Sequence, residues 1–260
     1  MSGGIHPTAV IEDGAQLHDS VTIGAYSIIG AGVELGADCV VGPHVVLRGP
    51  MRVGEGNRFF QFCSVGEISQ DLTARDDDDT RVEIGDRNTF REYVTVQRGT
   101  LKDKAVTRIG SNNLLMNQVH VAHDCSIGNG TVLANGASLA GHVDIEDHVI
   151  LGGFTLVHQF CRLGTHCFTG GGSIVLRDVP PWVMSEGSLA SPRGINKEGL
   201  RRRGFSADQI GEVQGLYKLL YRENRRLADV RELLSERAER SELAAQLLAF
   251  LERSKRSVQR

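Results

Sequence analysis

The stretch LLMNQVHVAHDCSIGNG, residues 114–130, contains the repeat that decides the fold. Its apolar residues Leu115, Val121 and Ile127 stand six positions apart. An α-helix repeats about every 3.6 residues and a strand about every two, so the spacing indicates neither a plain helix nor a plain strand. The same stretch also contains two histidines and an aspartate, which makes it the first candidate for chemistry.

The six-residue spacing runs through most of the first 175 residues. Apolar residues hold every repeat position in three runs: Ile5 to Val65, Ile84 to Val96, and Ile109 to Leu163. Thr169 is polar, and Val175 then restores the pattern. A hexad with a buried first residue, often followed by glycine, predicts one side of a parallel β-helix. Three sides make a coil, so residues 18 apart stack at roughly 4.8 Å, the spacing of neighbouring strands.

Two breaks in the repeat predict loops that leave the β-helix. The first, near 66–83, is polar and includes the four aspartates Asp76–Asp79, so we expect a solvated tip with substrate contact near its base at Asp71. The second, near 97–108, is short and basic and should lie beside the first.

The end of the chain predicts a second unit. A Pro/Gly/Ser-rich linker follows Val175, and we therefore expect a β-helix over 1–190 and a small α-helical domain over 191–260. Asn196 can cap a first helix, and Ser206 with Gln209 forms a capping box for a second. Residues 193–260 contain 16 Lys and Arg against 10 Asp and Glu, so this part is basic.

Composition excludes several classes of protein. The N-terminus has no basic start with an apolar run, and no 18-residue apolar segment occurs, so we expect no signal peptide and no transmembrane span. The formal net charge of −3 gives no indication of nucleic-acid binding. Five cysteines without paired spacing suit a reducing, cytoplasmic location. Each follows a repeat position by four residues, where other coils have small residues, so we expect buried, inert thiols: Cys39, Cys63, Cys125, Cys161 and Cys167.

Counting in steps of 18 gathers polar residues on successive coils. His123, Gly141 and Gln159 hold the same slot, two residues after an inward apolar residue. Neighbouring positions add three further histidines, namely His120, His142 and His158. Such clustering of titratable groups favours a functional site over isolated turn residues.

The pair His123 and Asp124 is the strongest candidate. A neutral imidazole can act as a general base near neutral pH, with either Asp124 or a backbone carbonyl fixing its tautomer. Gly141 can offer an unobstructed N–H to a developing oxyanion. A base and an oxyanion site without a nucleophile suit transfer of an acyl group from a thioester to a hydroxyl, with neither cofactor nor metal.

Longer motifs then resemble a known family. These are RVEIGDRNTFREYVTVQRGT, IGSNNLLMNQVHVAHDCSIGN, LAGHV, VHQFC, DVPPWV and EGLRRRGFS. Together they resemble the UDP-N-acetylglucosamine O-acyltransferases, hexapeptide-repeat enzymes that start lipid A biosynthesis. The resemblance covers nearly the whole chain. It implies a left-handed parallel β-helix, a homotrimer, and transfer of an (R)-3-hydroxyacyl chain from acyl carrier protein to the sugar 3-hydroxyl. An acidic carrier would suit the basic tail.

The resemblance also implies roles for residues. His123 would be the general base, Asp124 its orienting group and Gly141 the oxyanion donor. Residues expected to contact the nucleotide sugar or the acyl donor are Asp71, His120, His142, His158, Gln159, Asn196, Glu198, Arg202 and Arg203. Gly171 and Phe168 match positions near the end of the acyl chain. The family's QDLK is QDLT here, so Thr73 replaces a lysine and Arg75 is the candidate substitute.

Three alternatives remain open from the residues. A zinc lyase of the γ-carbonic-anhydrase type would use His120, His123 and His142 as metal ligands. A non-catalytic trimeric scaffold would use the prism faces for assembly. The related N-acyltransferase normally carries an extra N-terminal domain, for which repeats beginning at Ile5 leave no room.

Overall fold

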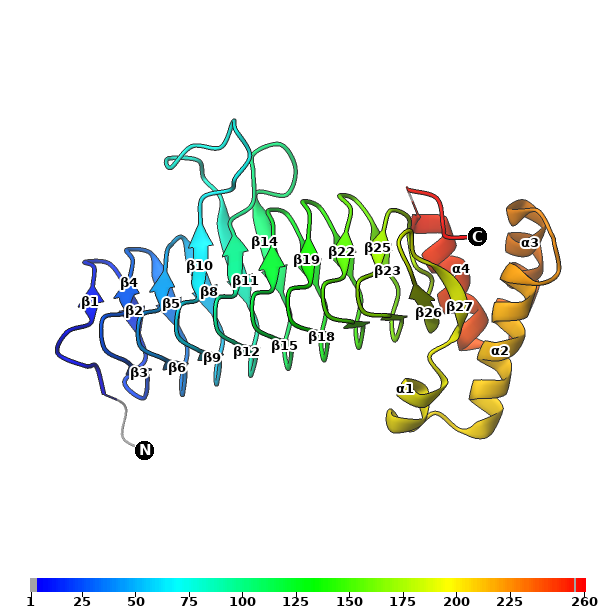
Figure 1. Cartoon of the computed structure of the whole chain (residues 1–260), viewed down its shortest axis with the longest axis horizontal. Helices are drawn as coiled ribbons and strands as arrows, with labels where there is room; N and C mark the ends of the chain where they lie inside the picture. The colour runs from blue at the N-terminus through cyan, green and yellow to red at the C-terminus, as the bar shows by residue number, and fades with distance from the viewer. Residues whose placement is uncertain (1–3, 255) are drawn as a thin grey trace.

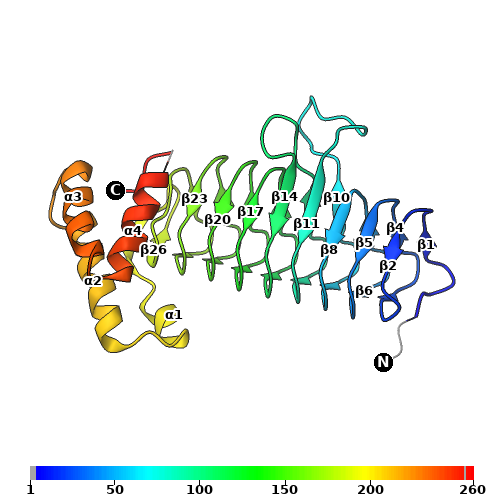
Figure 2. The ribbon, with the colours of Figure 1, turned by 180° about the vertical axis from the view of Figure 1, so that it is seen from behind.

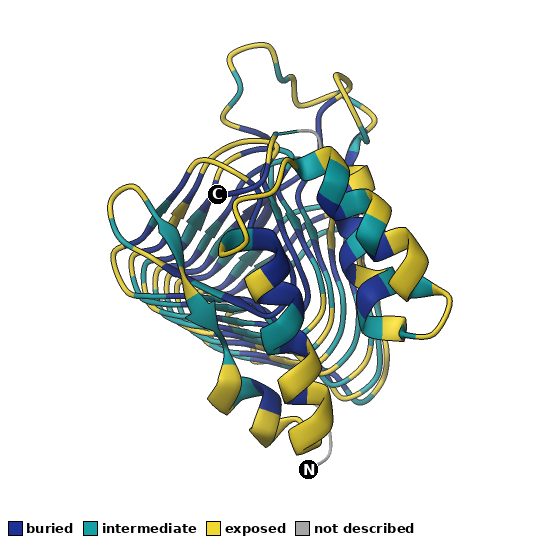
Figure 3. Cartoon of the chain, turned by 90° about the vertical axis from the view of Figure 1, so that its right-hand side faces the viewer, coloured by how far each residue is buried: buried dark blue, intermediate teal, exposed yellow. Residues whose placement is uncertain are grey.

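The chain forms a three-sided prism with a helical unit at its C-terminal end, as a computed structural model shows (Figure 1). The structure describes residues 4–254 and 256–260. The prism is a left-handed parallel β-helix, which confirms the predicted fold class. Seen toward the C-terminal end, the helices lie in front of the stacked coils (Figure 3).

Short strands form the three sides of the prism. Sheet B has nine strands: β1 Val10–Ile11, β4 Ile28–Ile29, β7 Val46–Leu47, β10 Ser64–Glu67, β13 Thr95–Gln97, β16 His120–Val121, β19 Ser138–Leu139, β22 Leu156–Val157 and β25 Ile174–Val175. Sheet C has eight: β2 Gln16–Leu17, β5 Val33–Leu35, β8 Met51–Val53, β11 Arg81–Ile84, β14 Val106–Ile109, β17 Ser126–Ile127, β20 Asp144–Ile145 and β23 Arg162–Leu163. Sheet A has ten: β3 Thr22–Ile23, β6 Val40–Val41, β9 Arg58–Phe59, β12 Thr89–Phe90, β15 Leu114–Leu115, β18 Val132–Leu133, β21 Ile150–Leu151, β24 Phe168–Thr169, β26 Val183–Glu186 and β27 Ser191–Ile195.

The register follows the predicted step of 18 residues. Val121 pairs with Leu139, and Leu139 with Val157, each in parallel on the next coil. These repeat residues point inward and are buried, so hydrophobic burial along the prism axis holds the coils together. The polar exception, Thr169, is also buried, and its hydroxyl bonds that of Thr155 at 2.9 Å.

Both predicted loops leave the same edge of the prism. Thr95 pairs with Ser64 across 31 residues and with His120 across 25, instead of 18, because residues are inserted between sheets B and C. The loops stand side by side above the prism (Figures 1 and 2). Lys102 of the second binds Asp71 of the first, with both Nζ–Oδ distances 2.9 Å, which confirms that the two are neighbours.

The stretch expected as a linker is instead a β-hairpin. β26 continues sheet A beside β24 and pairs antiparallel with β27, which lies inside the segment expected to be helical. Val183 and Ser185 alternate inward and are buried, so this segment closes the last coil rather than leaving the prism.

Four helices follow the hairpin: α1 Lys197–Arg202, α2 Ala207–Tyr221, α3 Leu227–Ala238 and α4 Glu242–Arg253. The predicted caps are present, since the Asn196 side chain accepts from the Gly199 N–H and Ser206 forms a capping box with Gln209. Trp182 packs among their apolar side chains and joins the helices to the prism. Among the described residues, no helix is long and apolar enough to span a membrane.

The five cysteines are buried and unpaired, as expected. Burial raises the pKa of the Cys63 and Cys125 thiols to about 12. At pH 8 only about one in 10⁴ such thiols is a thiolate. We therefore expect no alkylation of the folded protein by iodoacetamide, and five modifications in guanidinium chloride, counted by mass spectrometry. Rapid labelling of Cys125 in the folded protein would contradict this packing.

Two glycines near the helices should respond oppositely to alanine. A Cβ at Gly211 inside α2 meets nothing within 4 Å, so Gly211→Ala should raise the free energy of unfolding by about 0.5–1 kcal/mol. Gly204 follows α1 with φ +84°, where Gly204→Ala should lower it by about 1–2 kcal/mol. Denaturant unfolding of both variants measures the difference. Equal effects of the two substitutions would contradict the assigned backbone.

Candidate active site

The edge between sheets B and C brings most of the candidate residues together. After β16 the chain turns through His123 and Asp124 into β17, and after β19 it turns through Gly141 and His142 into β20. Asp124 and His142 both adopt left-handed backbone conformations, with φ 58° and 64°. The coils hold this turn in place because the His142 N–H donates to the His123 carbonyl at 3.0 Å.

His123 and Asp124 are in direct contact although they are sequence neighbours. The Nδ1 of His123 lies 2.9 Å from Asp124 Oδ2. The Asp124 carboxylate is fully buried and also accepts from the N–H and the hydroxyl of Thr100, at 3.0 and 2.6 Å. Burial alone would raise the pKa of the Asp124 carboxyl, but hydrogen bonds from His123 and Thr100 and the nearby His142 lower it below its usual range. The carboxylate is therefore ionised and can hold the His123 Nδ1–H.

Gly141 lies against the imidazole of His123. A Cβ built on Gly141 would stand 2.5 Å from Cε1 and 2.7 Å from Nε2 of that ring, so only glycine leaves the imidazole in place. Within residues 4–254 and 256–260 the Gly141 N–H donates no hydrogen bond. The site thus combines an oriented base with a free backbone donor beside it.

His142 forms the other wall of this corner. Its ring stacks on Phe160 with centroids 4.3 Å apart and meets the His123 ring edge-on at 4.9 Å. Its Nδ1 lies 2.8 Å from Oδ2 of Asp103 on the second loop and 4.0 Å from Oδ2 of Asp124.

Three further predicted residues surround the corner. His120 on β16 contacts the hydroxyl of Thr95 through Nδ1 at 2.7 Å, and burial lowers its pKa. His158 and Gln159 are exposed one coil beyond Gly141, and His158 Nδ1 lies 3.2 Å from the Gln159 carbonyl oxygen. The predicted alignment of these coils is therefore confirmed.

Asp71 is held by Lys102 and not by the expected Arg75. Hydrogen bonds from the Thr73 side chain and then from Lys102 hold the pKa of the Asp71 carboxyl well below its usual range. The Arg75 N–H instead donates to Asp78 within the first loop. The second loop thus supplies the cation that Thr73 cannot.

Other predicted residues lie at other edges of the prism. Asn196 Nδ2 donates to the His166 carbonyl and Arg203 to the Gly130 carbonyl, both between sheets C and A. Glu198 pairs there with the exposed Arg202, at 3.3 Å. The remaining edge, between sheets A and B, has Gly171, which follows Phe168 of β24. One chain therefore does not bring these residues to His123.

The histidines do not form the zinc site of the rival hypothesis. The groups close enough to share an ion among the described residues are His123, Asp124 and His142, with ligand atoms within 4.8 Å of one another. His120 is not among them, and its Nδ1 is engaged by Thr95. The predicted trio of imidazole ligands is thus not assembled.

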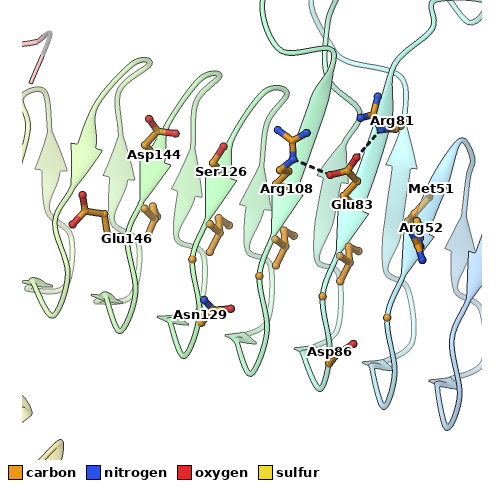
Figure 4. Close-up of a pocket in the computed structure, with 18 of the residues that line it drawn as sticks. Met51, Arg52, Arg81, Glu83, Asp86, Arg108, Ser126, Asn129, Asp144 and Glu146 are labelled. Atoms are coloured by element: carbon orange, nitrogen blue, oxygen red, sulfur yellow. Dashed lines mark hydrogen bonds and ion pairs between the residues drawn. The ribbon is translucent and has the colours of Figure 1, made fainter. Parts of the chain in front are cut away.

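The outer face of sheet C is charged (Figure 4). Glu83 accepts from Arg81 at 2.7 Å and from Arg108 at 2.8 Å, and these side chains line a groove that runs along the strands. The face lies between the edge with His123 and the edge with Arg203. The groove itself contains none of the predicted catalytic residues.

Sequence reasoning missed the second loop as part of the site. Thr100 secures Asp124, Lys102 binds Asp71, and Asp103 binds His142. The loop interrupts the six-residue repeat, so no period relates its residues to the coils. Its clustered charge, KDK at 102–104, was the one available signal.

Such a left-handed prism with a histidine corner defines the chain as a hexapeptide-repeat transferase. Comparison with known proteins agrees: a family model for bacterial transferase hexapeptide repeats matches residues 14–49 and 107–141. A second model, for domain 2 of UDP-N-acetylglucosamine O-acyltransferase, matches residues 178–259.

Solved structures extend the match to the whole chain. The UDP-N-acetylglucosamine acyltransferase of Francisella novicida is 38% identical, with a TM-score of 0.97 over 99% of this chain and 94% of its own. The corresponding enzyme of Acinetobacter baumannii is 42% identical, with a TM-score of 0.95 over 98% and 99%. That of Arabidopsis is 31% identical, with a TM-score of 0.81 over 98% and 99%. The chain belongs to the UDP-N-acetylglucosamine O-acyltransferase family.

Proposed function

We propose that this enzyme transfers an (R)-3-hydroxyacyl chain from acyl carrier protein to the 3-hydroxyl of UDP-N-acetylglucosamine, the first step of lipid A biosynthesis. The observation that carries the proposal is the His123 imidazole, whose Nδ1 is fixed by buried Asp124 and whose Nε2 lies beside Gly141. Family membership supplies the substrate class.

His123 is the general base of the proposed reaction. Its Nδ1–H is held by Asp124, so Nε2 is free to take the proton of the sugar hydroxyl. The hydroxyl oxygen then forms a bond to the thioester carbonyl carbon. Asp124 also stabilises the imidazolium that results, because an ionised carboxylate lies 2.9 Å away.

Gly141 stabilises the charge that develops on the thioester oxygen. Its N–H has no other partner among the described residues, and such a donor is typically worth about 10²–10³-fold in rate. The carbon–sulfur bond then breaks, and the carrier thiolate takes the proton back from His123. His120, His142, His158 and Gln159 contact the substrates around this centre.

We further propose that the complete site needs a homotrimer. The nucleotide-binding candidates Asn196, Glu198, Arg202 and Arg203 lie on a different edge from His123 in one chain. A neighbouring subunit packed over sheet C would bring its own such edge to His123. Arginine forks then hold the diphosphate by paired hydrogen bonds. Gly171 and Phe168 would limit the length of the acyl chain.

Acyl transfer with defined substrates tests the proposal. Acyl carrier proteins bearing (R)-3-hydroxyacyl chains of graded length are offered with UDP-N-acetylglucosamine, and products are identified by mass spectrometry. We expect an O-acylated nucleotide sugar and a preference for one chain length. Product only from an amino-sugar acceptor would overturn the assigned acceptor, and no product with any carrier would overturn the proposed function. Sedimentation equilibrium measures the trimer separately.

A further inference from the structure

The second loop places a carboxylate on the second histidine of the site. Asp103 Oδ2 lies 2.8 Å from His142 Nδ1, although the two residues are 39 positions apart. The corner therefore contains two carboxylate–imidazole pairs side by side, Asp124 with His123 and Asp103 with His142. The proposed acyl transfer needs only the first of these as a base.

The loop is fixed on both sides of Asp103. Lys102 binds Asp71 with both distances 2.9 Å. Lys104 donates to Asp144 at 3.1 Å and to the Asp124 carbonyl at 3.3 Å. Because both neighbours are anchored to different parts of the corner, the position of the Asp103 carboxylate is determined by the fold and not by a free side chain.

The two imidazoles have one carboxylate oxygen within common reach. Asp124 Oδ2 is 2.9 Å from His123 Nδ1 and 4.0 Å from His142 Nδ1. The His142 side chain is 11% exposed and is stacked on Phe160, so its ring has little room beyond a small shift toward that oxygen. Its Nδ1 needs an acceptor, and without Asp103 the nearest one is the oxygen that orients His123.

We propose that Asp103 is a positioning residue that keeps His142 away from Asp124, so that each imidazole has its own carboxylate. By accepting the Nδ1–H, Asp103 fixes the His142 tautomer and leaves Nε2, which has no hydrogen bond among the described residues, for the substrate. It thereby also reserves Asp124 Oδ2 for His123. The inference rests on the proposed function for its kinetic part.

Kinetics of Asp103→Ala test the inference. We expect kcat to fall by between about tenfold and 10²-fold, as for a misplaced catalytic group, with KM for UDP-N-acetylglucosamine changed less. Asp103→Glu should recover part of kcat. In Asp103→Ala/His142→Ala, kcat should be no lower than in His142→Ala alone, because Asp103 acts through His142. Additive losses would overturn the proposal. Asp77→Ala, an exposed aspartate of the first loop without a hydrogen bond among the described residues, is the matched control.

A second readout needs no substrate. The ¹⁵N spectrum of histidine-labelled protein reports which ring nitrogen carries the proton, and His142→Gln assigns the signal. In Asp103→Ala we expect the signals of both His142 and His123 to change, and in Asp77→Ala neither. An unchanged His142 signal would overturn the inference whether or not the enzyme acylates UDP-N-acetylglucosamine. Should Asp103→Ala not fold, Asp103→Asn, which keeps an acceptor oxygen, is compared with Asp103→Glu in both readouts: equal kcat and equal spectra in these two would likewise overturn it.

Discussion

Replacing His123 with alanine should lower kcat for acyl transfer by about 10²–10⁴-fold, because general-base catalysis is worth that much. Its imidazole is the one that the buried Asp124 orients beside the free Gly141 N–H. The side chain is 16% exposed and lies at a corner outside the apolar core, so folding should change little. Steady-state kinetics with acyl carrier protein as donor measure the loss, and circular dichroism and sedimentation measure folding and assembly.

His18→Ala provides the matched control for this substitution. His18 is an exposed corner histidine whose ring contacts only Ser20 among the described residues, at 2.9 Å, and its loss should leave kcat unchanged. If His123→Ala retained full activity with intact assembly, His123 would not be the base. A non-catalytic scaffold would then account better for the histidine corner.

The fold follows from the sequence because one period governs nearly all of it. Each inward position repeats after six residues and each coil after 18, so neighbours in space can be counted along the chain. Val121, Leu139 and Val157 stack as counted, and the polar slot beside them yields His123 and Gly141. Periodic burial is a local property, and it needs no knowledge of distant contacts.

The parts that escaped prediction are those without a period. The hairpin of β26 and β27 looked like a linker because its Pro and Gly residues suggest turns, whereas closure of the last coil depends on contacts with β24. Asp103 and Lys102 belong to a loop whose path is set by ion pairs across several coils. Such pairings depend on tertiary geometry, which residue spacing does not encode.

Gly141→Ala should lower kcat by about 10²-fold or more, since a displacement of about 1 Å can cost that much. The new methyl group would lie 2.5 Å from Cε1 of His123. The ring cannot simply move aside, because Nδ1 is bound to Asp124 and its other side meets His142 at 4.9 Å between centroids. Alanine keeps the backbone N–H, so the loss reports displacement of the base and not removal of the oxyanion donor.

Gly153→Ala separates this effect from a general cost of alanine at a corner. Gly153 occupies the equivalent slot after β21, and a Cβ there meets its nearest atom, the Asn135 carbonyl oxygen, at an ordinary 3.4 Å. We therefore expect normal kcat and an unchanged His123 ¹⁵N signal in Gly153→Ala, but a shifted signal in Gly141→Ala. Overpacking should also destabilise Gly141→Ala by about 1–3 kcal/mol, measured by denaturant unfolding. Full activity in Gly141→Ala would mean that His123 does not act from the position next to Gly141.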